Sequence, residues 1–202
     1  MSILSDPAAS RLLDAALTLF SRHGFQRTSM ADIALEAGLA RATLYARFKD
    51  KRAVIEALAT SLVETALAAA EAAWVEGNPL AANIEATLIA KDLPLYRLLH
   101  ASPHGAALLA FDADLTRDHA RRLDAGFAAL LTRRAEGEAA RGADLSAYGG
   151  AAGFGLFVAA AGPGLKHETR TEADYLAAVR TLATVLARAT APLAQPNKGT
   201  PP

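Results

Sequence analysis

The 202-residue sequence contains no cysteine, which excludes disulfides and thiolate metal sites. Aromatic residues make up only 6% and β-branched residues are also sparse, whereas alanine and leucine dominate. This composition disfavours β-structure and predicts an all-α protein. The first residues lack the basic region and long apolar run of a signal peptide, and we therefore expect a cytoplasmic protein.

The chain also lacks a net charge, because 21 basic residues balance 21 acidic ones, so composition alone gives no sign of nucleic-acid binding. The distribution of charge is more informative. Between Arg41 and Arg52 there are five basic side chains, and Asp50 is the only acidic one. An isolated cluster of this kind is usually a solvated face, but this one coincides with a recognisable motif and therefore favours a DNA-binding role.

The stretch from Thr28 to Arg52 has the layout of a helix-turn-helix. Its first helix begins with a capping-box pair, Ser29 and Asp32. Gly38 permits a sharp turn, after which Leu44 and Phe48 supply the apolar side of a second helix. We predict that this second helix enters the DNA major groove and that the following residues lie outside the core: Arg41, Ala42, Thr43, Tyr45 and Arg47.

Most of the remaining chain has the periodicity of long apolar helices. We predict a fourth helix that runs to about Glu76, a fifth that Asp92-Leu93-Pro94 interrupts, a short helix over about 95–101 and a long helix over about 105–140. The expected fold has about nine helices. An N-terminal helix-turn-helix domain over 6–52 is joined through the long fourth helix to a helical ligand-binding and dimerisation domain over 53–190, and a disordered tail follows over 191–202.

The segment from Leu145 to Leu165 carries no charged residue and is long enough to cross a membrane. Its Gly149-x-x-x-Gly153 spacing matches a pattern by which membrane helices pair. However, six of its 21 positions are glycine, and Pro163 breaks its C-terminal end. We therefore expect no membrane partner and assign the small residues to close approach between two helices of a soluble protein.

The residues from Arg11 to Leu58 resemble the N-terminal domain of the TetR family of bacterial transcription regulators. The resemblance covers about a quarter of the chain, and the combined spacing of its segments is highly specific; the rest matches only in helical pattern. In chain order the matching segments are His23-Gly24-Phe25, Thr28-Ser29-Met30, Asp32-Ile33-Ala34, Ala37-Gly38-Leu39, Thr43-Leu44-Tyr45, Phe48 and Lys51.

The resemblance implies contacts between this domain and DNA phosphates. Thr28 and Ser29 would hold a phosphate at the start of the first helix of the motif. Tyr45 would donate a hydrogen bond to another phosphate, and Lys51 would neutralise a third from the start of the fourth helix.

The resemblance also implies that Arg41 meets a base edge or a phosphate and that Ala42 and Thr43 lie against bases. The chain departs from the family at two positions. Ala40 stands where the family often has serine, and alanine cannot cap the recognition helix. Arg47 stands where the family commonly has an aromatic residue, so one aromatic phosphate contact is lost and a guanidinium is gained.

A homodimer is a further implication of the resemblance, in which the helices over 145–163 and 171–190 of each subunit form a four-helix bundle. In the family's usual mechanism, a small ligand binds among the middle helices and moves the fourth helix. That movement changes the spacing of the two recognition helices, which must match half-sites roughly 34–36 Å apart or a multiple of that distance. We assign the dimer interface to Gly149, Gly153, Leu156, Val179, Leu182 and Leu186.

Aromatic and polar residues of the middle helices are candidates for a ligand pocket, although ordinary core packing is the alternative for each of them. Few charges interrupt these helices, which favours a neutral or apolar ligand. His100-x-x-x-His104 suggests a metal site, but Pro103 breaks the helix between the two histidines, and we expect no metal and no cofactor. The candidate pocket residues are Trp74, Tyr96, His100, Phe111, Phe127, Phe154 and Phe157.

Enzyme motifs are missing as well: the sequence has no Gly-x-Ser-x-Gly elbow, no His-Glu-x-x-His and no phosphate-binding loop. We therefore expect a regulator and not an enzyme. The predicted function is a ligand-responsive transcriptional repressor that binds a palindromic operator as a homodimer and is released by a small apolar molecule. The alternative is a helical small-molecule-binding or scaffold protein without sequence-specific DNA binding.

Overall fold

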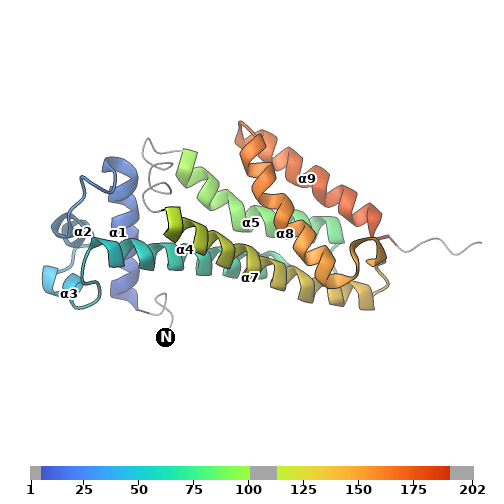
Figure 1. The fold of residues 1–202 in the computed structure, drawn as a ribbon, viewed down its shortest axis with the longest axis horizontal. Coiled ribbons are helices and arrows are strands. Elements are labelled where there is room, and N and C mark those ends of the chain that lie inside the picture. Colours follow the sequence, from blue (N-terminus) through green and yellow to red (C-terminus); the bar gives the residue numbers. More distant parts are fainter. Residues whose placement is uncertain (1–5, 101–112, 192–202) are drawn as a thin grey trace, which may run out of the picture. The chain divides into compact units, whose positions relative to one another are not determined.

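A computed structural model describes residues 6–100 and 113–191, except for the side chains of residues 99, 100, 113–116 and 167. Within these ranges the chain forms helices and turns and no strand, which confirms the all-α prediction. Figure 1 shows the arrangement of the elements, which are α1 (Pro7–His23), α2 (Met30–Glu36), α3 (Arg41–Tyr45), α4 (Lys51–Ala73), α5 (Leu80–His100), α7 (Ala113–Ala140), a 3-10 helix η2 (Ser146–Tyr148), α8 (Ala151–Glu168) and α9 (Glu172–Ala189).

Helix α1 begins and ends where its sequence predicts. The Asp6 carboxylate accepts hydrogen bonds from the amides of Ala8 and Ala9, at 2.9 and 3.3 Å, and Pro7 occupies the first helical position. Gly24 follows the last turn with a φ of 82°, a value that glycine adopts without steric cost. Local signals alone therefore define both ends of this helix.

The chain divides into two compact units. The first contains the described residues within 1–69 and 90–123, and the second contains those within 70–89 and 124–202. The divisions fall inside α4, α5 and α7, so each of these helices contributes to both units. The division in α4 lies after Ala69, farther along the helix than the domain end expected at residue 52, and the functional division at residue 52 stays a prediction.

Apolar side chains of α1–α4 form the core beneath the helix-turn-helix in the first unit. Among them are Leu12 and Phe20 of α1, Ile33 of α2, Leu44 of α3 and Val54 of α4, and each of them is buried. Burial of one such side chain stabilises a fold by about 1.5–3 kcal/mol. Figure 1 shows α1, α2 and α3 gathered around the first turns of α4, which the shared core explains.

Helix α5 runs unbroken through Pro94, although the sequence predicted an interruption at Asp92-Leu93-Pro94 followed by a separate short helix. An interior proline removes one backbone hydrogen bond and crowds the preceding turn, which costs about 3 kcal/mol. Pro94 itself is exposed, while Leu93 and Tyr96 beside it are buried. We attribute the continuous helix to this burial, which offsets the local cost of the proline.

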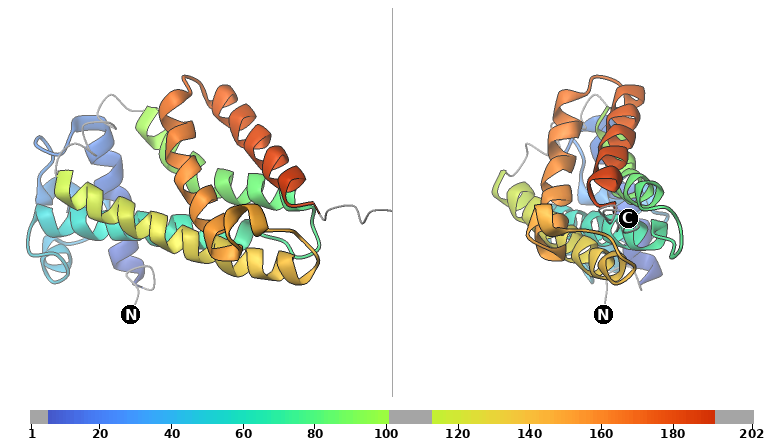
Figure 2. Two further views of the ribbon diagram at one scale, coloured as in Figure 1. Left: turned by 45° about the vertical axis from the view of Figure 1, so that its right-hand side comes forward. Right: turned by 90° about the vertical axis from the view of Figure 1, so that its right-hand side faces the viewer.

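Turns in the second unit are closed by a side-chain amide and by a helix cap. The Asn83 amide accepts a hydrogen bond from the backbone N–H of Val75 and donates one to its carbonyl, at 3.1 and 3.0 Å. At the start of α9, the Thr171 hydroxyl accepts from the Asp174 amide at 3.1 Å, as the sequence predicted. Helices α8 and α9 lie side by side in both views of Figure 2 and pack against each other.

Helix α4 is long and apolar enough to cross a membrane by length and composition, with a mean hydropathy of 1.5 over its most apolar window. The segment that the sequence singled out forms a shorter apolar stretch in α8, Ala151–Lys166. A single helix such as α4 does not indicate a membrane protein, because the core helix of a soluble protein passes the same test. Val54, Ile55 and Leu58 of α4 are in fact part of the core of the first unit.

Candidate nucleic-acid interface

The turn between α2 and α3 depends on Gly38, whose φ is +62°. A Cβ at this position would lie 3.1 Å from Nη2 of Arg11. The same nitrogen donates a hydrogen bond to the Ala37 carbonyl at 2.7 Å, so the arginine cannot easily move away. The positive φ confirms the sharp turn predicted at Gly38. A larger residue would need both a left-handed backbone and a displaced Arg11.

Helix α3 places one apolar side chain inward and leaves its other side chains toward the surface. Leu44 is completely buried, whereas Arg41 and Ala42 are exposed and Thr43 is half-buried. Tyr45 is 54% exposed, which is unusual for a large aromatic side chain that could have joined the core. The outward set is the one that the sequence predicted, apart from the partial burial of Thr43.

The N-terminus of α3 has no side-chain cap, as Ala40 predicted. The Ala40 carbonyl accepts hydrogen bonds from the amides of Thr43 and Leu44, at 2.9 and 3.3 Å, but its methyl side chain can accept none. A helix of five residues has little stability of its own. Its position therefore depends on contacts with the rest of the first unit.

Arg47 supplies such a contact at the other end of α3. Its Nε and Nη2 donate hydrogen bonds to the two carboxylate oxygens of Asp6, at 2.8 and 3.3 Å, and its Nη1 donates to the Thr43 carbonyl at 3.3 Å. The hydrogen bonds from Arg47 hold the pKa of Asp6 below its ordinary value of 3.8. The carboxylate that caps α1 thus also ties the end of α3, and the guanidinium that the sequence offered to DNA is engaged within the chain.

Lys51 has a second role that the sequence did not predict. Its ammonium donates hydrogen bonds to the carbonyls of Phe25 and Thr28, at 2.6 and 2.7 Å, and lies 4.3 Å from the centre of the Phe25 ring. Burial lowers the pKa of this ammonium. The first turn of α4 therefore fixes the loop between α1 and α2, and the phosphate contact expected of Lys51 stays a prediction.

Both hydroxyls at the start of α2 form contacts inside the chain. Thr28 is buried and donates to the Gly24 carbonyl at 3.0 Å. Ser29 accepts from the Asp32 amide at 3.2 Å while Asp32 accepts from the Ser29 amide at 2.9 Å, which confirms the predicted capping box. Hydrogen bonds from Ser29 also keep the pKa of Asp32 below its ordinary value.

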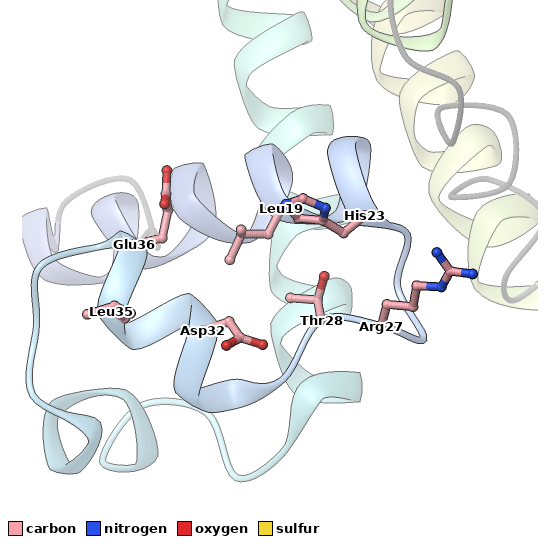
Figure 3. Close-up of a pocket in the computed structure, with 7 residues that line it drawn as sticks. All are labelled: Leu19, His23, Arg27, Thr28, Asp32, Leu35 and Glu36. Carbon is pink, nitrogen blue, oxygen red and sulfur yellow. The ribbon is translucent and has the colours of Figure 1, made fainter.

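An open groove of about 330 Å³ lies beside these residues, between α1 and α2 (Figure 3). Its wall includes Arg27 and Thr28 of the loop, together with Asp32 and Leu35 of α2. Arg27 is exposed, and Figure 3 shows its guanidinium extending away from the other labelled side chains. Sequence reasoning passed over Arg27, although a basic residue immediately before the helix start at Thr28 was a usable signal for a phosphate contact.

Residues 12–58 match the sequence profile described as "Bacterial regulatory proteins, tetR family". The N-terminal domain is therefore similar to that of tetR-family regulators. Among curated relatives of this domain, the uncharacterized HTH-type transcriptional regulator YvkB of Bacillus subtilis is 38% identical over 52 residues, which are 26% of this chain and 28% of that protein. The HTH-type transcriptional regulator UidR of Escherichia coli is 37% identical over 68 residues, 34% of this chain and 35% of that protein.

These alignments span only about a third of the curated relatives' length or less. The fold resemblance reaches beyond the tetR-family domain. A solved complex of SmeT with triclosan superposes on 97% of this chain and 100% of its own with a TM-score of 0.65, at 17% sequence identity. At that identity the likeness shows a shared fold and gives no information about a shared ligand.

The residues predicted to line a ligand pocket follow the tetR-family domain and are divided between the two units. Trp74, Phe127 and Phe154 are buried in the second unit, and Phe157 of the same unit is 51% exposed. Tyr96 is buried and belongs to the first unit. Their burial agrees with core packing, and a role in ligand binding stays a prediction for each of them.

Two further candidates fall outside the described part of the chain, namely the side chain of His100 and the whole of Phe111. His104 and Asp112, which suggested a metal site, also lie outside it. Among the described residues, no group of three or more histidine, aspartate or glutamate side chains is placed to hold a metal ion. The structure therefore neither confirms nor contradicts the expectation, made from the sequence, that the chain binds no metal.

Most of the residues predicted to form a dimer interface are buried or close turns within the chain itself. Val179 and Leu186 are 0% and 1% exposed, so the apolar stripe of α9 packs inside the chain, and Leu182 is half-buried. Gly149 has a left-handed φ of 74° in the turn before α8, and a Cβ on Gly153 would collide with the Tyr148 carbonyl. These glycines thus serve the local backbone geometry of the chain.

Leu156 of α8 is the exception among the predicted interface residues, because it is 63% exposed. Two other large apolar side chains of these helices, which the sequence did not assign to the interface, share this property. Phe157 of α8 is 51% exposed and Val185 of α9 is 56% exposed. Exposed large apolar side chains on a packed helix pair are better candidates for an interaction surface than the buried stripe.

Proposed function

We propose that the protein is a ligand-responsive transcriptional repressor that binds a palindromic operator as a homodimer in the cytoplasm. The observation that carries this proposal is the exposed face of α3. Arg41, Ala42 and Tyr45 are all exposed there on a helix that Leu44 anchors in the core. A helix held in this way can enter the major groove without losing its own packing.

The proposal gives the outward residues different tasks. Arg41 forms no hydrogen bond or ion pair within the described part of the chain, so its guanidinium is available for a guanine edge or a phosphate. Thr43 and Ala42 lie against bases, and Tyr45 and Arg27 contact phosphates. Ser29, Thr28, Arg47 and Lys51 contribute chiefly by holding α2 and α3 in place, in agreement with their contacts inside the chain.

Dimerisation is proposed to use α8 and α9. The support is the exposure of Leu156, Phe157 and Val185, since a monomer would leave three large apolar side chains in water. Sedimentation analysis of Phe157→Glu should show a monomer where the unaltered chain is a dimer. Ala173→Glu adds the same charge at another exposed position of the helix pair and should leave the dimer intact.

Release by a small molecule is the remaining part of the proposal. SmeT, whose fold the chain shares, was solved as a complex with triclosan, so a protein of this fold can bind a small organic molecule. Helix α4 is the element best placed to respond, because Lys51 in its first turn holds the loop that precedes α2.

Selection of bound DNA from a random pool tests the proposal as a whole. We expect a palindromic consensus, because a two-fold symmetric dimer presents two α3 helices to two half-sites. Recovery of folded, dimeric protein that enriches no sequence at low salt would favour the alternative, a helical small-molecule-binding protein without sequence-specific DNA binding. Enrichment of a single, non-repeated site would overturn the palindrome and keep DNA binding.

A further inference from the structure

The segment around α3 contains few of the side chains that read a base by hydrogen bonding. From Leu39 to Asp50 there is no asparagine, glutamine or glutamate. Paired hydrogen bonds to adenine need asparagine or glutamine, and the amino group of cytosine is read by a carboxylate. The one acid of the segment, Asp50, accepts a hydrogen bond from the Ala53 amide at 2.7 Å at the start of α4. The segment is therefore poorly equipped to read adenine or cytosine.

The basic side chains from Arg41 to Arg52 are not equally available to DNA. Arg41 and Lys49 are exposed and form no hydrogen bond or ion pair within the described part of the chain, and only Arg41 lies on α3. The other three are engaged within the chain: Arg47 with Asp6, Lys51 with the Phe25 and Thr28 carbonyls, and Arg52 with Glu56 at 3.0 Å.

Arg41 has both the chemistry and the position to read guanine. Its guanidinium is a rigid fork of donors, which matches the O6 and N7 acceptors that guanine presents in the major groove. It is the first residue of α3, and the N-terminal residues of a recognition helix are the ones that contact base edges. The charges of Arg41 and Asp32 attract each other, but the Asp32 carboxylate accepts hydrogen bonds from the amide and hydroxyl of Ser29, at 2.9 and 2.7 Å.

The backbone that carries Arg41 is fixed at both ends of α3. Leu44 is completely buried, Arg47 donates to the Thr43 carbonyl and to Asp6, and Gly38 sets the turn before the helix. Next to Arg41, Ala42 exposes a methyl group, which suits contact with the methyl group of a thymine. The face thus combines one free guanidinium with one exposed methyl group on a short, anchored helix.

We propose that each operator half-site contains a guanine whose O6 and N7 accept hydrogen bonds from Arg41, and a neighbouring thymine whose methyl group contacts Ala42. The inference rests on the proposed function, because it names the bases that the same DNA-binding face reads. It assigns Arg41 to a base edge and not to a phosphate. We therefore expect the strongest sequence preference at one G·C pair in each half-site.

Fluorescence anisotropy of the full chain with a DNA duplex that carries the selected consensus tests the guanine. Each guanine of the consensus is replaced in turn by 7-deazaguanine, which lacks the N7 acceptor but keeps O6 and normal base pairing. At one position we expect at least roughly threefold weaker binding, and adenine at the same position should weaken binding by about 5- to 150-fold. A consensus without guanine, or equal affinity for every 7-deazaguanine duplex, would overturn the inference.

Variants of the chain then test whether Arg41 is the side chain that reads this guanine. Arg41→Ala should bind the guanine and 7-deazaguanine duplexes equally, because the contact that distinguishes them is gone. Lys49→Ala, which removes an exposed lysine outside α3, should keep the difference. A difference that persists in Arg41→Ala would overturn the assignment. Uniform weakening of all sequences by Arg41→Ala, with the salt slope reduced by about 1, would assign Arg41 to a phosphate instead.

The thymine contact has a test of the same form. Replacing the neighbouring thymine by deoxyuridine removes only its methyl group and should weaken binding by about two- to fourfold. Ala42→Gly should bind the thymine and deoxyuridine duplexes equally. Glycine also lowers helix propensity, so the comparison uses the ratio of the two affinities measured for one variant. A ratio that Ala42→Gly leaves unchanged would overturn the role of Ala42.

The outcomes separate this inference from the proposed function. A folded dimer that enriches no DNA would overturn the proposed function, and this inference with it. A palindromic consensus that is bound equally well with guanine and with 7-deazaguanine would overturn this inference alone, and DNA binding by a homodimer would stand.

Discussion

The helix-turn-helix region (α1–α3 with the first turn of α4) and the C-terminal region (α8 and α9 with the second half of α7) are held together by different means. In the first, polar side chains connect separate segments: Arg47 with Asp6, Lys51 with the loop carbonyls, and Arg11 with Ala37. In the second, glycines allow close backbone approach. A Cβ on Gly155 of α8 would lie 2.5 Å from the Thr132 hydroxyl and 2.7 Å from the Ala128 carbonyl of α7.

The solvent-exposed surfaces of the two regions differ as well. The helix-turn-helix region leaves a polar and aromatic face with Arg41 and Tyr45, suited to DNA. The C-terminal region leaves Leu156, Phe157 and Val185, suited to another protein surface. In the helix-turn-helix region, Arg11, Arg47 and Lys51 bind groups within the chain, and Arg41 still gives the surface a positive charge. In the C-terminal region, helices that pack through glycines need few large side chains at their contacts, so large apolar side chains can remain exposed.

The largest expected effect on stability comes from the glycine packing. Gly155→Ala should lower the free energy of unfolding by about 2 kcal/mol, because overpacking against backbone at the upper end of about 3 kcal/mol exceeds the roughly 1 kcal/mol gained in helix propensity. Gly164→Ala is the matched control in the same helix, since no atom lies within 4 Å of the added Cβ. It should be neutral or slightly stabilising in urea unfolding, and equal destabilisation by both variants would contradict the packing argument.

Arg41→Ala should act on DNA and not on the fold. We expect a loss of about 1–3 kcal/mol at the selected operator if the arginine reads a base, with unchanged unfolding, because the side chain is exposed and makes no internal hydrogen bond. Fluorescence anisotropy with the operator measures the loss, and Lys49→Ala serves as the charge-matched control. A similar loss with Lys49→Ala would indicate general electrostatics in place of a specific contact.

Lys51→Met should reveal which of two tasks the lysine performs. Loss of its charged hydrogen bonds to Phe25 and Thr28 should lower stability by about 1.5 kcal/mol, since the methionine keeps the apolar stem but donates nothing. A direct phosphate contact would in addition reduce the slope of log affinity against log salt by about 1. Unchanged stability together with a reduced salt slope would show that Lys51 acts mainly through a direct contact with a DNA phosphate, as the sequence suggested.

The smallest expected effect is that of pH on the ion pair between Asp6, which caps α1, and Arg47, which follows α3. The Asp6 pKa is lowered in the folded protein, so its contribution is present above about pH 3.8 and is lost as the pH falls through the lower, folded value. NMR titration of the Asp6 carboxyl should show a midpoint below 3.8, and Arg47→Gln should move it upward. A midpoint that does not respond to Arg47→Gln would show that the tie does not persist in solution.

Sequence patterns predicted the local features of the fold well. Asp6-Pro7, Ser29 with Asp32 and Thr171 with Asp174 each form the helix start that their spacing indicated, because a cap involves only residues a turn apart. Pro94 shows where such reasoning fails. A local breaker was overridden by the burial of its helical neighbours, and burial cannot be read from one segment alone.

The sequence by itself determined the helical class, the helix starts, the turn at Gly38 and the outward set on α3, since these follow from periodicity, capping and a single permitted φ. The tertiary structure decided which of the outward basic side chains form contacts within the chain. Arg47 and Lys51 bind groups that lie 41 and 26 residues away in the chain, whereas Arg41 binds none within the described residues. It also moved the candidate interface from Val179 and Leu186 to Phe157 and Val185, because only packing determines which face of an apolar helix is already covered.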